Sequence, residues 1–144
     1  MERLQQTVRV RVGEGTIDTL ALVDEVRRPD SGATVLFLGT VRDHSDGRGG
    51  VTHLEYETYA EFVESKIGEI VAEAASKWPV LAAVVEHRSG EVAVREVSVA
   101  VAVSTAHRVD AFAAAEYIID ELKAHAPIWK KEYRPSGAEW SRGS

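Results

Sequence analysis

The chain has 144 residues, a length that suits one domain with its own core, and we predict a single domain over residues 1–144. The composition is 44% hydrophobic and 28% charged, without a secretory signal or an apolar run of the roughly 18 residues that span a membrane, so we expect a cytoplasmic protein without membrane contact. The absence of cysteine excludes disulfides, thiolate metal sites and cysteine nucleophiles, and the net charge of −6 argues against nucleic acid as a partner.

The first third of the chain is predicted to form two strands separated by a short helix. Alternating valines over Thr7–Val12 are typical of a half-buried strand. Pro29–Gly32 has turn chemistry, and the mostly apolar run Ala33–Val41 is rich in residues that favour strands. Residues 43–50 are acidic and rich in glycine, and they predict a mobile loop. We expect the inward face of the intervening helix to consist of Ile17, Leu20, Val23 and Val26.

The rest of the chain continues to alternate between strands and helices. The order β-α-β-β-α-β-β-α-β indicates an α+β fold, with helices packed on a largely antiparallel sheet. The expected elements are the strands Val51–Tyr59 (Leu54 and Tyr56 on one face), Leu81–His87 and Glu96–Ser104, the helices Ala60–Trp78 and Arg108–Lys123, and an extended segment from Pro127 to Arg134. We expect the inward face of the last helix to consist of Phe112, Ala115, Ile119 and Leu122.

The first candidate for a site is the end of the apolar strand, Phe37-Leu38-Gly39-Thr40-Val41-Arg42. An arginine stands there just before a glycine-rich loop. A guanidinium in such a position can bind phosphate or carboxylate through its planar, forked set of donors. The alternative interpretation of Arg42 is an ordinary surface arginine at the end of a strand.

The second candidate is Ser104-Thr105-Ala106-His107-Arg108, between a valine-rich strand and a helix. The start of a helix attracts anions, because its N–H groups are unpaired and it carries about half a positive charge. His107 and Arg108 oppose that dipole, and a local conflict of this kind more often marks a functional site than a structural need. The alternative is a helix that begins near Asp110 and leaves the pair in a loop.

The third candidate is the segment from Lys123 to Glu132, in the cationic end of the chain. Residues 123–144 have a net charge of +3, so the other 122 residues sum to −9. Lys123 also complements the dipole at the end of its helix, and a solvated tail is therefore the alternative. If the chain after Pro127 is extended, Lys130 and Lys131 point to opposite sides, and only one of them easily faces a pocket. The composition predicts a cationic pocket for a phosphorylated ligand.

The segments that carry a family resemblance include these three clusters, in the same order along the chain. They are Phe37–Arg42, Leu54–Tyr59, Glu86–Gly90, Ala106–Arg108, Ala111–Phe112, Leu122–Lys123 and Pro127–Glu132. Together they resemble the catalytic (large) subunit of molybdopterin synthase. The similarity runs from about Gly32 to Trp140, and the ordered set that ends in Lys…Pro-X-Trp-Lys-Lys-Glu is its most specific part.

The resemblance implies an α/β hammerhead-type fold and a sulfurtransferase of molybdenum cofactor biosynthesis. It implies a homodimer of this chain with a small ubiquitin-like sulfur-carrier subunit at each end. The carboxy-terminal thiocarboxylate of that partner would thread into the pocket, and two deliveries of sulfur would convert cyclic pyranopterin monophosphate into molybdopterin. No cofactor and no metal site are implied. The sulfur arrives on the partner, which agrees with the absence of cysteine from this chain.

The same resemblance assigns roles to individual residues of the site. The predicted catalytic residues are Lys123 and Lys130, and the predicted substrate-binding residues are Phe37, Arg42, His107, Arg108 and Lys130. We expect Arg42, His107 and Arg108 to converge on one anion site for the phosphate. Lys123 is expected nearest the chemistry, as an acid or as a stabiliser of the charge on the leaving oxygen. A buried lysine among other cations would have a lowered pKa and could transfer protons near neutral pH.

Two further expectations concern the assembly. The family often uses an arginine beyond the final tryptophan that reaches the neighbouring subunit's site, and Arg142 is the candidate for it. The homodimer is expected to bury apolar β-surface, because the valine-rich strands offer more than three modest helices can cover. The competing interpretation is a non-catalytic, ferredoxin-like regulatory module that binds a small anionic ligand, because the first six elements, β-α-β-β-α-β, also suit that fold.

Overall fold

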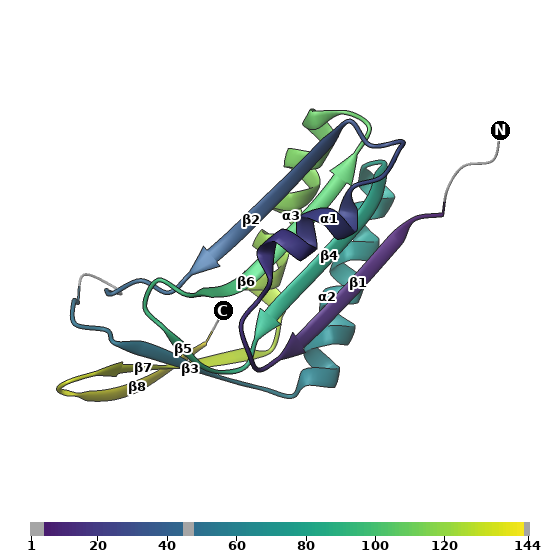
Figure 1. Cartoon of the computed structure of the whole chain (residues 1–144). Coiled ribbons are helices and arrows are strands. Elements are labelled where there is room, and N and C mark those ends of the chain that lie inside the picture. Colours follow the sequence, from purple (N-terminus) through teal and green to yellow (C-terminus); the bar gives the residue numbers. More distant parts are fainter. Residues whose placement is uncertain (1–4, 45–47, 143–144) are drawn as a thin grey trace.

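The computed structural model describes residues 5–44 and 48–142, in which three helices pack against two four-stranded sheets (Figure 1). The α+β prediction is confirmed. No helix in these residues is long and apolar enough to cross a membrane. The elements are β1 (Thr7–Gly13), α1 (Thr19–Val26), β2 (Ala33–Thr40), β3 (His53–Thr58), α2 (Ala60–Lys77), β4 (Val80–Arg88), β5 (Gly90–Ala93), β6 (Val97–Thr105), α3 (Arg108–His125), β7 (Ile128–Arg134) and β8 (Gly137–Arg142).

The larger sheet has the strand order β1-β4-β6-β2 and lies between two layers of helix. Figure 1 shows α1 on one face of this sheet and α2 with α3 on the other. The central strand β6 is therefore buried on both faces, which explains why its valines alternate with small residues. Val101 and Val103 join the core beneath α2 and α3, whereas Ala100 and Ala102 meet Leu22 of α1. Helices thus cover the central valine-rich strands, and the bare β-surface expected on them is absent.

Two residues expected to face inward are exposed. Leu20 is 78% exposed, because α1 has only two turns and contacts the sheet through Leu22 and Val26, one helical turn apart. Phe112 is 62% exposed, because it lies beside the inward stripe of α3, to which the buried Ile118 belongs. In both helices several apolar side chains compete for the inward face, and only packing against the sheet decides between them.

The second sheet is antiparallel, in the order β5-β3-β7-β8, and β5 and β8 are strands that the periodicity did not predict. Leu54 and Tyr56 of β3 lie on one face of the strand, as predicted, and both are buried. On β7, Lys130 faces the interior side of the sheet and lines a cavity. Its neighbour Lys131 lies on the other side, with its ammonium 5.3 Å from the ring centre of Trp140. The alternation of the strand therefore separates the two lysines, as expected for an extended segment.

A close contact at the end of β2 directs the chain toward Arg42. A Cβ atom added to Gly39 would lie 2.6 Å from Cγ1 of Val99, so only glycine fits against this neighbour. The register with β6 shifts immediately afterwards, between Gly39 and Thr40. Such a bulge bends a strand and changes the direction of the residues that follow. The backbone of Val41 is then held by Glu96 and Arg95, at 3.0 and 2.8 Å, and this fixes the starting point of Arg42.

We predict that Gly39→Ala lowers the free energy of unfolding by about 1–3 kcal/mol, because the added methyl group overlaps Val99. Val99→Ala makes room for that methyl group, so the double variant should lose less than the sum of the two single losses. Gly68→Ala on α2 is the matched control, since nothing lies within 4 Å of the added atom and alanine favours helix. Denaturant unfolding measures all four variants, and strict additivity of Gly39→Ala and Val99→Ala would contradict the overlap.

Candidate functional site

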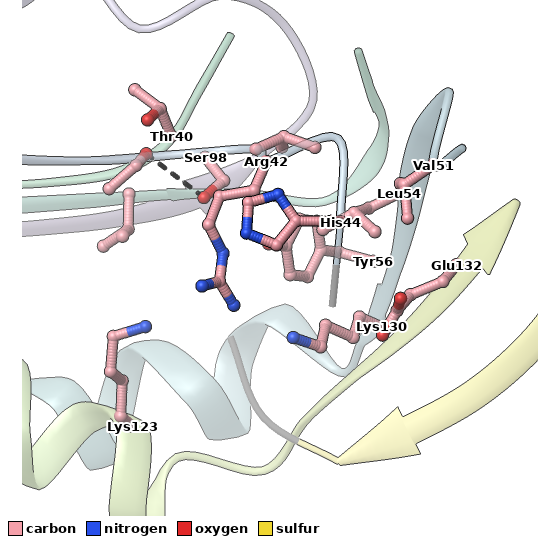
Figure 2. A pocket seen from close by; sticks show the side chains of 13 residues that line it. Thr40, Arg42, His44, Val51, Leu54, Tyr56, Ser98, Lys123, Lys130 and Glu132 are labelled. Carbon is pink, nitrogen blue, oxygen red and sulfur yellow. Dashed lines mark hydrogen bonds between the residues drawn. The ribbon is translucent and has the colours of Figure 1, made fainter. Parts of the chain in front are cut away.

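A cavity of about 340 Å³ lies where the end of β2 meets the second sheet and the last turn of α3. Figure 2 shows the side chains of Arg42, Lys123 and Lys130 entering it from three segments, with their nitrogen atoms directed toward a common space. Three of the predicted site residues are therefore brought together by the fold. The remaining lining consists of Gly39, Thr40, Val41, His44, Val51, Leu54, Tyr56, Ser98, Val99 and Glu132.

The ammonium of Lys123 is held among other cations. Lys123 lies in the last turn of α3, directly after the buried Leu122. The packed end of the helix therefore fixes the position of the Lys123 backbone beside the cavity. Burial lowers the pKa of Lys123, and the charges of Lys130 and Arg42 lower it further. A lysine with a lowered pKa releases its proton more readily than one in water, which suits a group that donates a proton to a leaving oxygen.

Among the described residues, one carboxylate lines this cationic cavity. Glu132 stands two residues after Lys130 on β7, so both side chains point to the same side of the sheet. The guanidinium of Arg134 contacts the Glu132 carboxylate at 3.0 Å, and both side chains are largely buried. Because Arg134 balances Glu132, the charges of Arg42, Lys123 and Lys130 dominate the cavity, which can accommodate an anion with more than one negative charge.

Tyr56 lines the cavity and forms a buried aromatic pair with His87. Tyr56 is 4% exposed, and its ring meets the ring of His87 edge-on, with centroids 5.0 Å apart. Burial raises the pKa of Tyr56, so its hydroxyl stays protonated. His87 is 1% exposed and donates from Nδ1 to the carbonyl oxygen of Arg88 at 2.7 Å. Burial lowers the pKa of His87 to about 4 despite that hydrogen bond, and Lys123 adds to the effect, so the imidazole is neutral at pH 7.

Phe37, His107 and Arg108 do not line this cavity. Phe37 is partly buried against the core beneath the helices. His107 is the N-cap of α3 and Arg108 is its first residue, which excludes the alternative start near Asp110. Lys123 stands at the other end of the same helix, about 22 Å away at 1.5 Å per residue. The expected convergence of Arg42, His107 and Arg108 is therefore wrong within one subunit, because α3 is a rigid spacer between its two ends.

The structure also adds residues that the sequence interpretation did not select. Glu132 could have been found from its two-residue spacing to Lys130, and Tyr56 from its predicted face. His44 carried no such signal, because it follows Arg42 in a segment without periodicity. In the register of β8 with β7, Arg142 lies opposite Trp129. The side chain of Trp129 faces away from the cavity of its own subunit, so Arg142 does not serve that cavity.

Comparison with known proteins identifies the family of the chain. The family model described as MoaE protein matches residues 12–125.

The chain belongs to the MoaE protein family. A molybdopterin synthase catalytic subunit from Thermoplasma volcanium is 48% identical over 128 residues, which is 89% of this chain and 93% of that protein. The crystal structure of molybdopterin synthase from Staphylococcus aureus matches with a TM-score of 0.86 and 34% identity, over 92% of this chain and 96% of that one.

A further solved structure shares the fold at lower identity. It is the complex of subunits 1 and 2 of the molybdopterin-converting factor from Helicobacter pylori, with a TM-score of 0.75 and 22% identity. The match covers 92% of this chain and 90% of that one. At this identity the similarity shows the fold alone.

The neutral, buried His87 predicts a loss of stability in acid. In the unfolded chain the imidazole of His87 takes up a proton near pH 6.5, whereas in the folded chain its pKa is about 4. The free energy of unfolding should therefore decrease as the pH falls through this window, by about 3 kcal/mol in total from this group. His87→Phe keeps a ring against Tyr56 but cannot titrate, so its pH dependence should be smaller by one proton. Denaturant unfolding between about pH 7 and 4.5 measures this, and equal slopes would contradict it.

Proposed function

We propose that this chain is the catalytic subunit of a cytoplasmic molybdopterin synthase. In this proposal it is a sulfurtransferase that converts cyclic pyranopterin monophosphate to molybdopterin, using sulfur from the carboxy-terminal thiocarboxylate of a small ubiquitin-like partner. The observation that carries the proposal is the convergence of Arg42, Lys123 and Lys130 in one cavity of a MoaE-family chain. The relatives at high identity are themselves molybdopterin synthase catalytic subunits.

The proposed chemistry brings two anions into one space, and the three cations suit both. The planar fork of Arg42 can bind the substrate phosphate through two hydrogen bonds, whereas Lys130 offers a point charge for the incoming thiocarboxylate. As sulfur bonds to the substrate carbon, the carbon–oxygen bond of the cyclic phosphate breaks and its electron pair leaves with oxygen. Lys123 then donates its proton to that oxygen or stabilises its charge, and its lowered pKa favours the transfer.

The composition agrees with a sulfur that arrives on a partner. The chain has no cysteine, so it cannot hold the sulfur as a persulfide of its own. In the proposed reaction the partner's thiocarboxylate carries the sulfur. A ferredoxin-like module that only binds a regulatory anion would explain the cationic cavity as well, and it would form no product with that partner.

We propose that a second copy of the chain supplies His107 and Arg108 to each cavity. Within one subunit these residues start α3, about 22 Å from Lys123, and cannot reach its site. The exposed apolar residues beside them, Val109 at 72% and Phe112 at 62%, suit burial against another protein surface. In the proposed two-fold symmetric dimer, the first turn of α3 in each subunit lies at the cavity of the other. The contact occurs twice because both subunits use the same surface patch.

Lys123→Ala is predicted to remove most of the turnover. Loss of one preorganised electrostatic group costs about 10²–10³ in rate, and alanine preserves the helix because it is an even better helix former than lysine. Lys131→Ala is the matched control, since this lysine lies on the outer side of β7 against Trp140. Single-turnover formation of the dithiolene product from thiocarboxylated partner measures both variants. Wild-type activity in Lys123→Ala would overturn the assignment.

An exchange of subunits tests whether Arg108 acts across the dimer. Each of the single variants Lys123→Ala and Arg108→Ala should be nearly inactive alone. In a mixed dimer one cavity carries both substitutions, while the other combines an intact Lys123 with an intact Arg108 from the opposite subunit. Mixing the two inactive proteins under conditions of subunit exchange should therefore restore activity. If mixing restores nothing although mixed dimers are present, Arg108 does not serve the neighbouring cavity.

A further inference from the structure

The cavity contains one more chemically versatile side chain, the imidazole of His44. In Figure 2 this ring lies beside the side chain of Arg42, above the space that Lys123 and Lys130 also enter. Histidine is the residue type that exchanges protons near neutral pH, and no other histidine lines this cavity among the described residues. None of the cationic roles proposed above uses it.

His44 is oriented by a neighbouring carboxylate. Its Nδ1 lies 2.9 Å from Oδ1 of Asp43, and the backbone of Asp43 is tied down in turn, because its carbonyl oxygen accepts a hydrogen bond from the N–H of Val51 at 2.9 Å. An accepting carboxylate places the proton of the neutral ring on Nδ1, so the lone pair is on Nε2. A base held by a third group is the arrangement that enzymes use to activate a hydroxyl or a water.

The proposed reaction contains a step that needs such a base. Once sulfur has bonded to the substrate, it still carries the acyl group of the partner, and the two proteins are joined through a thioester to the pterin. Water must cleave that bond before the partner can leave. Resting on the proposed function, we propose that His44 is the general base that activates this water, with Asp43 as its positioning residue.

The step is balanced without an oxidant or a reductant. The water oxygen attacks the acyl carbon while Nε2 of His44 accepts one proton of the water. The acyl carbon–sulfur bond then breaks, and its electron pair remains on the sulfur. The products are the partner's terminal carboxylic acid, which ionises, and a thiolate on the substrate, which lies among the three cations and can receive the proton from His44.

The other groups around the cavity are poorly suited to accept that proton. Arg42 and Lys130 are cations that donate hydrogen bonds and cannot accept them. The Glu132 carboxylate is bound by Arg134 at 3.0 Å. Among the described residues, the remaining titratable groups at the cavity are Tyr56, whose pKa is raised by burial, and Lys123, which the proposed reaction assigns to the leaving oxygen of the phosphate.

The test follows the acyl intermediate by intact-protein mass spectrometry, with wild-type chain, thiocarboxylated partner and the cyclic substrate. In His44→Gln the adduct between partner and pterin should accumulate, and release of the partner carboxylate should slow by at least about 10²-fold. Asp43→Asn should slow release less, and added imidazole should restore release in His44→Ala.

The matched control is His125→Gln, an exposed histidine at the end of α3 that does not line the cavity, and it should release the partner at the wild-type rate. Wild-type release by His44→Gln would overturn the proposal, and so would a variant that fails already at adduct formation, since His44 would then serve binding. If the wild-type chain itself forms neither adduct nor product, the proposed function fails instead, which separates the two conclusions.

Discussion

Like charges gathered in a partly buried cavity repel one another and raise the free energy of the folded chain, and Arg42, Lys123 and Lys130 form such a group. The repulsion is visible in Lys123, whose pKa falls because burial and the two neighbouring cations disfavour its charged form. A bound anion relieves this strain, so the same arrangement that opposes folding favours a phosphorylated substrate and a thiocarboxylate. The scaffold must therefore be rigid enough to hold the cations together when no anion is present.

Each cation is held by a different structural device. A glycine against Val99 and the bulge that follows it direct the end of β2, and with it Arg42. The end of α3 fixes Lys123, and strand alternation on β7 turns Lys130 inward and Lys131 outward. The first two devices depend on the larger sheet, whose central strands are packed on both faces by helices, whereas β7 belongs to the second sheet. Substitutions of Val101, Val103, Ala100 or Ala102 on β6 are thus expected to disturb the cavity although these residues do not line it.

The length of α3 links the cavity to the proposed assembly. A helix of 18 residues keeps Arg108 and Lys123 at opposite ends, so one subunit has cationic groups at two separate places. In the proposed homodimer this separation is useful, since each helix contributes Lys123 to its own cavity and its first turn to the other. Dimer formation and catalysis would then be coupled, because a dissociated subunit would lack His107 and Arg108 at its site.

The sequence alone determined the α+β class, the helices and the main strands, because apolar residues recur with the period of each element. It also determined that Lys130 and Lys131 face opposite ways, which follows from the geometry of any extended segment. It did not determine which residues meet. Phe112 and Leu20 carried an apolar signal but are exposed, and β5 and β8 carried too weak a signal to be predicted. His107 and Arg108 matched a family pattern, but that pattern does not show where the two residues lie in space. Only the structure shows that α3 separates them from Lys123. Only the tertiary structure shows that His44 enters the cavity. The path of a loop depends on the elements that anchor its two ends, and a loop has no hydrophobic periodicity from which that path could be predicted.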